Sequence, residues 1–200
     1  MRRRGPLPWL KPGVFTGALV PLAAILWRAW HDQLGANPIA QALNQLGLIA
    51  LVFLIAALVC TPLKTLFGWT WGNRLRRMLG LFGFFYAVLH VATYSGLDQQ
   101  FDWRAIWTDV TKRKFIFIGF AAFVLLIPLV VTSTNGSPKR LGFTWWKRLH
   151  RLAYFAPLLG VIHFVWRVKK DVTEPATYGV VLAALLAVRV ASYLRTRLAA

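Results

Sequence analysis

The sequence predicts an all-α integral membrane protein, a bundle of six transmembrane helices that forms one domain over residues 1–200. Of these residues 58% are hydrophobic and 15% are charged, whereas a soluble domain averages about 45–50% apolar and about 25% charged residues. The apolar residues gather in runs close to the roughly 20 residues that a helix needs to cross a bilayer. The net charge of +18 flanks those runs, which indicates membrane topology rather than nucleic-acid binding.

Three predicted spans contain no Lys, Arg, Asp or Glu, and they cover residues 45–63, 78–97 and 115–134. We expect the first of these helices to close at Thr61-Pro62, because proline cannot donate the next helical hydrogen bond.

The other three spans carry a proline or an arginine. Residues 14–30 include Pro21 and Arg28, and we expect a retained helix there because no signal-peptide cleavage site follows. Residues 150–167 are short of a full span, but terminal arginines can extend them by snorkelling. Residues 176–194 are interrupted only by Arg189. The single cysteine, Cys60, excludes an internal disulfide and a cysteine-rich metal site.

The positive charges predict the orientation of the bundle. Fourteen Lys and Arg residues flank the spans on the side of both termini, and eight flank them on the other side together with all six acids. Because cytoplasmic loops carry the excess of Lys and Arg, we expect both termini in the cytoplasm.

Histidines are the main candidates for chemistry, because the six spans contain no Asp or Glu. His31 lies at a span end beside Asp32 and is expected to be a solvated interfacial residue. His90 and His163 fall 13 and 15 positions into two helices that run the same way, or roughly 20 and 22 Å from the cytoplasmic boundary. Such a pair, at one depth in the outer half of the bilayer, can bind a cofactor metal between two helices.

Small residues precede both histidines on the same helix face. They lie three and seven positions before each histidine: Ala87 and Gly83 for His90, Gly160 and Ala156 for His163. They either let the helices pack closely or leave a flat slot for a planar macrocycle, which with two histidines suggests a haem.

Two further residues have open roles. Arg167, one turn beyond His163, can pair with a haem propionate or snorkel to the interface. His150 lies about 140° around a straight helix from His163, so a shared site requires a kink at Pro157. His150 is therefore either a cofactor ligand or an interfacial hydrogen-bonding residue, and the matching position on the third span is Arg76 or Arg77.

Several short segments resemble the MsrQ (YedZ) family, a group of membrane subunits related to ferric-reductase-like transmembrane domains. The specific part of the resemblance runs from about residue 74 to residue 170. It is carried by RRMLG at 76–80, LHVATY at 89–94, Thr132-Ser133, Leu141-Gly142, Trp145, LHRLAY at 149–154 and HFVW at 163–166.

The resemblance implies a bacterial inner-membrane b-type cytochrome, an electron-transfer subunit rather than a catalytic one. Haem-binding histidines of the family correspond to His90, His150 and His163. The implied acceptor is MsrP, a periplasmic molybdopterin enzyme that repairs oxidised methionine, and the implied donor is the quinone pool or a cytoplasmic flavin reductase. FMN is implied by the resemblance alone, since no flavin motif is apparent.

Two alternatives stay open at this stage. One is a stand-alone ferric or quinone-linked haem reductase without a partner of the MsrP type. The other is a metal or small-solute transporter with histidines as transient ligands, against which the lack of intramembrane carboxylates counts.

Overall fold

The computed structural model of the chain describes residues 8–168 and 171–198, and within them the secondary structure is helical. Six segments are long and apolar enough to cross a membrane, which confirms the predicted all-α, six-span architecture. The helices in chain order are α1 (Leu10–Trp30), α2 (Pro38–Phe67), α3 (Gly72–Ala92), the π-helix η1 (Thr93–Asp98), α4 (Trp103–Lys112), α5 (Lys114–Val131), α6 (Ser137–Leu141), α7 (Phe143–Leu149), α8 (Leu152–Arg167) and α9 (Thr173–Leu198).

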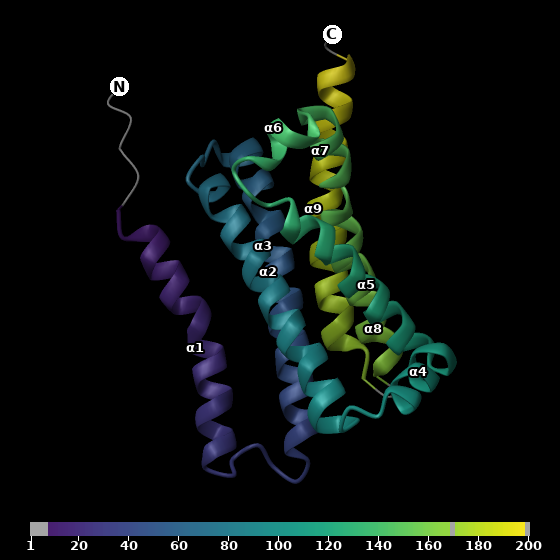
Figure 1. Ribbon diagram of the computed structural model, residues 1–200. Coiled ribbons are helices and arrows are strands. Elements are labelled where there is room, and N and C mark those ends of the chain that lie inside the picture. The colour runs from purple at the N-terminus through teal and green to yellow at the C-terminus, as the bar shows by residue number, and fades with distance from the viewer. Residues whose placement is uncertain (1–7, 169–170, 199–200) are drawn as a thin grey trace.

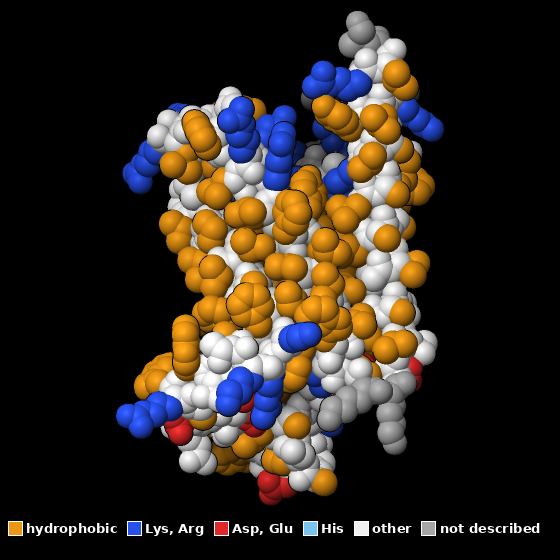
Figure 2. Space-filling view, turned by 90° about the vertical axis from the view of Figure 1, so that its right-hand side faces the viewer, with side chains coloured by type: hydrophobic (Ala, Val, Ile, Leu, Met, Phe, Trp, Pro, Cys, Tyr) orange, Lys and Arg blue, Asp and Glu red, His pale blue; other side chains and the backbone are white. Residues whose placement is uncertain are grey.

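The long helices run up and down between two ends of the bundle (Figure 1), and these ends differ in charge. One end, which we call the basic end, holds the start of α1, the loop at residues 68–71, α6, α7 and the end of α9. The opposite, mixed-charge end holds residues 31–37, η1, α4 and residues 168, 171 and 172. Figure 2 shows an apolar band between them, with acidic side chains only toward the mixed-charge end. Of the flanking charges counted in the sequence, Arg2, Arg3, Arg4, Lys169 and Lys170 lie outside the described residues.

Helix α2 is the central helix of the bundle. One of its faces packs Leu46 against Phe82 of α3 in a buried cluster that also holds part of α1. Its other face packs Leu58 among Val161 of α8 and Leu182 of α9. Because α2 contacts both halves of the bundle, it can set the relative positions of α3 and α8.

The expected end of this helix at Thr61-Pro62 is wrong, because α2 continues through Pro62 to Phe67. Proline lacks the N–H that would donate to the carbonyl oxygen of Leu58, four residues earlier. In its place Arg189 of α9 donates from Nη2 to that oxygen. The helix ends instead at Gly68, whose φ of 68° is the left-handed conformation that glycine adopts without strain. The intramembrane arginine therefore compensates the intrahelical proline.

A buried hydroxyl adds a polar link between helix α1 and the bundle, beside the apolar packing of α1. Tyr86 of α3 is fully buried and donates from its hydroxyl to the carbonyl oxygen of Ala18, 2.7 Å away. The same hydroxyl accepts from the backbone N–H of Leu22 at 3.2 Å. It thus lies within the hydrogen-bond ladder of α1 next to Pro21, a position where an inserted group is well accommodated.

The helix of the fifth span is interrupted at His150 and Arg151 and not at Pro157. Helix α8 continues without a break through the buried Pro157, and the interruption lies between α7 and α8. The calculation of about 140° assumed one continuous helix, so it does not describe this segment. His150 belongs to the short α7 as its C-terminal cap.

A candidate two-histidine cofactor site

His90 and His163 meet between α3 and α8 in the half of the bundle near the mixed-charge end. Their ring centroids are 6.3 Å apart, and their ring planes are inclined by 82°. Both side chains are half-buried. The structure thus brings together the two histidines that the sequence places at one depth.

The ring of His90 rests against the backbone of α2. Its Nδ1 lies 2.9 Å from the carbonyl oxygen of Leu43. A methyl group on Gly47, one turn along α2, would lie only 3.1 Å from Cε1 and Nδ1 of that ring. Contacts between 3.0 and 3.4 Å are tighter than almost all those of real Cβ atoms, so the missing side chain of Gly47 makes room for the imidazole.

The ring of His163 has the same environment on α5. Its Nδ1 lies 2.6 Å from the carbonyl oxygen of Phe115. A methyl group on Gly119, again one turn further along the helix, would lie 2.6 Å from the same nitrogen. In both cases the histidine is held by a carbonyl that precedes a helical glycine by four residues.

These hydrogen bonds determine which ring nitrogen is available. A carbonyl oxygen can only accept, so each Nδ1 must carry the proton and donate it. The neutral imidazole then has its lone pair on Nε2, the arrangement in which a histidine with a backbone partner binds a metal. No hydrogen bond of either Nε2 occurs among the described residues. Both histidines are thus oriented as metal ligands.

The separation of the rings fits one metal ion between them. Two bonds of roughly 2 Å to imidazole nitrogen, plus roughly 1 Å from each nitrogen to its ring centre, place the centroids about 6 Å apart. The observed 6.3 Å agrees with that sum. A haem would require only two protein ligands of this kind, and His90 and His163 would be the residues that hold it.

Sequence reasoning missed the two glycines and the two carbonyls. Their common spacing becomes visible only once the contacts are known: each histidine follows its carbonyl partner by nearly the same number of residues, 47 for Leu43 and His90 and 48 for Phe115 and His163. The α2–α3 and α5–α8 pairs therefore repeat one arrangement that no sequence identity between them reveals.

The four small residues pack differently from the flat slot that the sequence suggested. A methyl group on Gly83 would lie 2.7 Å from the side chain of Leu54 of α2, and one on Gly160 would lie 3.3 Å from Leu51. Ala156 is buried in a cluster of apolar side chains from α5 and α8, and Ala87 packs against the same cluster. In this structure these residues let neighbouring helices approach closely, as small residues do in membrane bundles.

Arg167 lies close to the histidine pair and is tied to α2. Its Nη1 donates to Oδ1 of Asn44 at 2.5 Å, next to the residue whose carbonyl holds His90. Its guanidinium also lies over the ring of Phe164, 5.3 Å from the centroid. It is within electrostatic range of both histidines. The arginine thus places a positive charge beside the pair, on the side of the mixed-charge end.

His150 lies apart from this pair, near the basic end. Its Nδ1 is 3.1 Å from the carbonyl oxygen of Trp146 on its own helix, and its ring stacks on that tryptophan with centroids 4.0 Å apart. Its Nε2 is buried without a hydrogen-bond partner among the described residues. His31 is exposed and stacks on Trp27 at the mixed-charge end, outside both places.

Known proteins resemble this chain over nearly its whole length. Residues 42–161 match the family described as ferric reductase like transmembrane component. A protein of Deinococcus radiodurans is 51% identical over 184 residues, which cover 92% of this chain and 91% of that protein. Proteins of Rhodospirillum rubrum and Herminiimonas arsenicoxydans are 50% and 48% identical, over 92% of this chain and 88% and 85% of theirs. All three are named protein-methionine-sulfoxide reductase heme-binding subunit MsrQ.

Proposed function

Because this chain belongs to the ferric reductase like transmembrane family, and within it to the MsrQ subunits, we propose that it is a b-type cytochrome that carries electrons for methionine sulfoxide reduction. The observation that supports this most is the histidine pair, with centroids 6.3 Å apart and each Nδ1 bonded to a helix carbonyl.

His90 and His163 hold the haem iron in this proposal, one from α3 and one from α8. A haem bound there supplies a one-electron couple in the apolar interior of the bundle. The carbonyls of Leu43 and Phe115 keep both Nδ1 atoms protonated and the rings oriented, which raises the basicity of each Nε2. Because His90 and His163 would both hold the iron, a haem bound there would supply electron transfer rather than oxygen chemistry.

The remaining residues of the site have supporting roles. Arg167 supplies a positive charge that suits a haem propionate. Gly83, Ala87, Ala156 and Gly160 let α2, α3, α5 and α8 approach closely around the cofactor. His150, with its buried Nε2, is a candidate ligand or contact for a further cofactor near the basic end.

The charges favour one orientation of the bundle in the membrane, and this orientation determines the proposed direction of electron flow. The excess of Lys and Arg on the side of the termini favours a cytoplasmic basic end in the bacterial inner membrane. The histidine pair then lies toward the periplasm, where the proposed acceptor is the molybdopterin enzyme MsrP. Each methionine sulfoxide takes two electrons and two protons to give methionine and water, so a one-electron carrier must turn over twice.

The proposed donor reaches the basic end, either as quinol from the membrane or as a cytoplasmic flavin reductase. FMN is a proposed second cofactor, supported by the family resemblance. The whole chain is proposed to form a single ferric-reductase-like domain, since α2 packs against helices of both halves.

The optical spectrum of the purified protein tests the histidine assignment. We expect a low-spin b-type spectrum, abolished by His90→Ala and by His163→Ala and unaffected by His31→Ala, which removes an exposed histidine. A full low-spin spectrum in either of the first two variants would falsify the assignment. Reduced protein in nanodiscs should also be reoxidised by purified MsrP and oxidised methionine together. Reoxidation by ferric chelates but not by MsrP would instead indicate a stand-alone reductase.

A further inference from the structure

Helix α4 lies at the mixed-charge end and is too short to cross a membrane. It has ten residues, which make a helix about 15 Å long, and it packs against α5 at the edge of the bundle (Figure 1). Its half-buried side chains are those of Ala105, Ile106, Asp109 and Val110. The other side chains of α4 are exposed, so any further contact of this helix comes from outside the chain.

Two tryptophans border the half-buried face of α4. Trp103 and Trp107, one turn apart, are 68% and 70% exposed. At 3.6 residues per turn they lie next to Ile106 and Val110 on the helix, so the four side chains form one apolar face that the protein covers only in part. Within the described ranges neither indole N–H has an acceptor. An exposed ring with a free polar tip is typical of tryptophan at a membrane–water interface.

The turn before α4 holds another aromatic ring on the outside. Gln100 and Phe101 have φ angles of 48° and 60°, a left-handed conformation that is strained for a residue with a bulky side chain. The Phe101 ring is nevertheless 61% exposed, and its centroid lies 6.1 Å from that of Trp103. Burial within the protein does not offset this strain. An apolar environment outside the chain would.

Positive charge accompanies the aromatic rings. Three exposed cations of this segment form no ion pair among the described residues: Arg104, Lys112 and Lys114. The two acids are engaged, because Asp102 caps the start of α4 and Asp109 pairs with Arg113 at 3.1 Å. Exposed aromatic rings beside unpaired cations are typical of a helix that lies on an anionic membrane surface.

Short connections keep α4 at the membrane surface. The span that ends at Asp98 is joined to α4 by residues 99–102, and Arg113 alone separates α4 from the span that begins at Lys114. A helix held this closely between two spans remains beside the lipid. The arrangement therefore favours a bilayer over a soluble protein as the partner of the exposed rings.

Helix α4 is also connected to both histidine ligands. The carboxylate of Asp109 accepts from the hydroxyl of Tyr94 at 2.9 Å, and Tyr94 lies about one helical turn beyond His90. In the other direction α4 leads directly into α5, where the carbonyl oxygen of Phe115 holds the ring of His163. A displacement of α4 would thus affect both imidazoles.

We propose that α4 binds the lipid–water interface at the mixed-charge end and in this way holds both histidines in place. The rings of Phe101, Trp103 and Trp107 enter the headgroup layer, and Arg104 and Lys112 face its phosphates. The partner is a bilayer that contains anionic phospholipid. The effect on haem rests on the proposed function, whereas the location of α4 does not.

Spin-label accessibility of the intact protein in phosphatidylglycerol nanodiscs tests the location. The native Cys60 is buried, so a nitroxide is attached at Trp107→Cys, on the aromatic face, or at Thr108→Cys, on the polar face. Oxygen concentrates in lipid, and a nickel chelate stays in water. We expect the ratio of oxygen to nickel accessibility to be at least threefold higher at position 107 than at position 108. Equal ratios would overturn the proposal.

Release of α4 tests the effect on the histidines. Trp103→Ser/Trp107→Ser removes two exposed rings and leaves no cavity in the protein. We expect amide exchange across residues 103–112 to become at least tenfold faster and haem per protein to fall at least twofold. Trp103→Phe/Trp107→Phe should restore most of both, because phenylalanine keeps an apolar ring.

Trp27→Ser/Trp30→Ser is the matched control for this release. It also removes two exposed tryptophans at the mixed-charge end, but from α1. The exchange of α4 and the haem content should stay as in the parent. An equal loss in this control, or an unchanged haem content after release of α4, would overturn the proposal.

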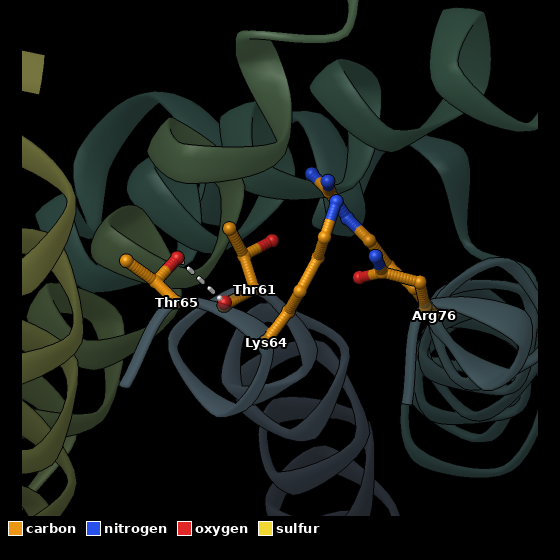
Figure 3. Close-up of a pocket in the computed structure, with 5 residues that line it drawn as sticks. Thr61, Lys64, Thr65 and Arg76 are labelled. Carbon is orange, nitrogen blue, oxygen red and sulfur yellow. Dashed lines mark hydrogen bonds between the residues drawn. The ribbon is translucent and has the colours of Figure 1, made fainter. Parts of the chain in front are cut away.

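The charge of the lipid provides a third test. Exchange across residues 103–112 should be at least threefold slower in phosphatidylglycerol than in phosphatidylcholine, and Arg104→Gln/Lys112→Gln should abolish the difference. Lys64→Gln/Arg76→Gln is the control, because it removes two cations that reach toward each other at the basic end, beyond the apolar band (Figure 3). It should keep the difference.

Two further outcomes would overturn the proposal. One is the same exchange of α4 in both lipids. The other is protection of position 107 from nickel only when a soluble reductase is added, which would assign the aromatic face to a protein partner. Failure of the haem assignment is distinguishable, because it is read from the spectra of His90→Ala and His163→Ala and not from α4.

Discussion

The histidines near the two ends of the bundle differ in the helix that holds their rings. Near the mixed-charge end, His90 and His163 are each held by a carbonyl of a neighbouring helix, and the two rings face a common space. Near the basic end, His150 is held by a carbonyl of its own helix and stacked on Trp146, and the cation Arg76 lies within electrostatic range of it.

The difference shows what makes a histidine a ligand in this fold. In all three histidines Nδ1 is hydrogen-bonded to a backbone carbonyl and Nε2 is left to bind a metal. The protonation pattern alone therefore does not distinguish the pair from His150. The difference between them is contact with a neighbouring helix. The rings of His90 and His163 each pack against a glycine of another helix, so both their own helix and that neighbour fix the direction of the ring. The ring of His150 follows only α7, and no second imidazole lies opposite it among the described residues.

The largest effect we expect comes from filling the glycine space behind His163. In Gly119→Ala the new methyl group would lie 2.6 Å from Nδ1, against 3.1 Å for Gly47→Ala and His90. Overpacking typically costs about 1–3 kcal/mol, and each 1.4 kcal/mol is about tenfold in occupancy. Gly119→Ala should therefore lose at least tenfold in haem content, and Gly47→Ala distinctly less, measured as haem per protein.

Gly80→Ala is the control for this series, because a methyl group there meets nothing within 4 Å. It should leave haem content unchanged. Equal haem content in all three variants would show that the glycines do not orient the histidines.

His150→Ala should have an intermediate effect. The low-spin spectrum belongs to the pair near the mixed-charge end, so we expect it to persist. A cofactor held by the single imidazole of His150 would be lost, which would lower haem per protein by up to half. Complete loss of the low-spin band in a folded His150→Ala protein would place His150 in the same site as the pair, contrary to the separation seen in the fold.

The sequence alone was sufficient for the architecture and for the pairing of His90 with His163. Membrane spans follow from uncharged runs, and two histidines at equal depth on parallel helices can meet if their helices are neighbours and the two faces turn inward. The contacts of the two imidazole rings with Gly47 and Gly119 could not be predicted in this way, because they depend on which face of α2 and of α5 is turned toward the site.

The prolines show the second limit. The helix-breaking tendency of proline predicted a helix end at Pro62. In the structure the helix continues, and the carbonyl of Leu58, which proline leaves without a backbone donor, accepts from Arg189, 131 residues away. At Pro157 the same tendency suggested a kink, and the helix is interrupted at His150 instead. Propensity describes a helix in isolation, whereas a donor from a distant helix can satisfy the group that a proline leaves free.

A double-mutant cycle between Arg189 and Pro62 tests that pairing at the basic end. Arg189→Met leaves the carbonyl of Leu58 without a donor, and an unsatisfied buried acceptor costs roughly 1–3 kcal/mol. Pro62→Ala returns a backbone N–H that can reach the same oxygen. Pro62→Ala should therefore stabilise the Arg189→Met protein more than the parent by about 1 kcal/mol, measured by denaturant unfolding in micelles.

The cycle subtracts the effect of proline on the unfolded chain, which is present in both backgrounds. It also subtracts the gain from removing a charge from the membrane interior. Strict additivity of the two changes would mean that Arg189 does not support the carbonyl, and that its contact with the ring of Tyr154, 5.3 Å from the centroid, is its main interaction.

The smallest effect we expect is a shift of redox potential from Arg167, the positive charge beside the histidine pair. A nearby positive charge favours the reduced iron, because reduction adds a negative charge that it attracts. Arg167→Gln should therefore lower the midpoint potential by roughly 70 mV, as expected for a unit charge roughly 10 Å away at an effective dielectric constant of roughly 20. The low-spin spectrum should persist, since glutamine can still bond to Asn44.

Arg104→Gln is the control, because Arg104 is an exposed arginine at the same end of the bundle. This variant should shift the potential by less than a third as much, because solvent screens the charge of Arg104. An unchanged potential in Arg167→Gln would contradict this expectation, and would mean that another group compensates the lost charge, as a bound propionate would by taking up a proton when its partner is removed.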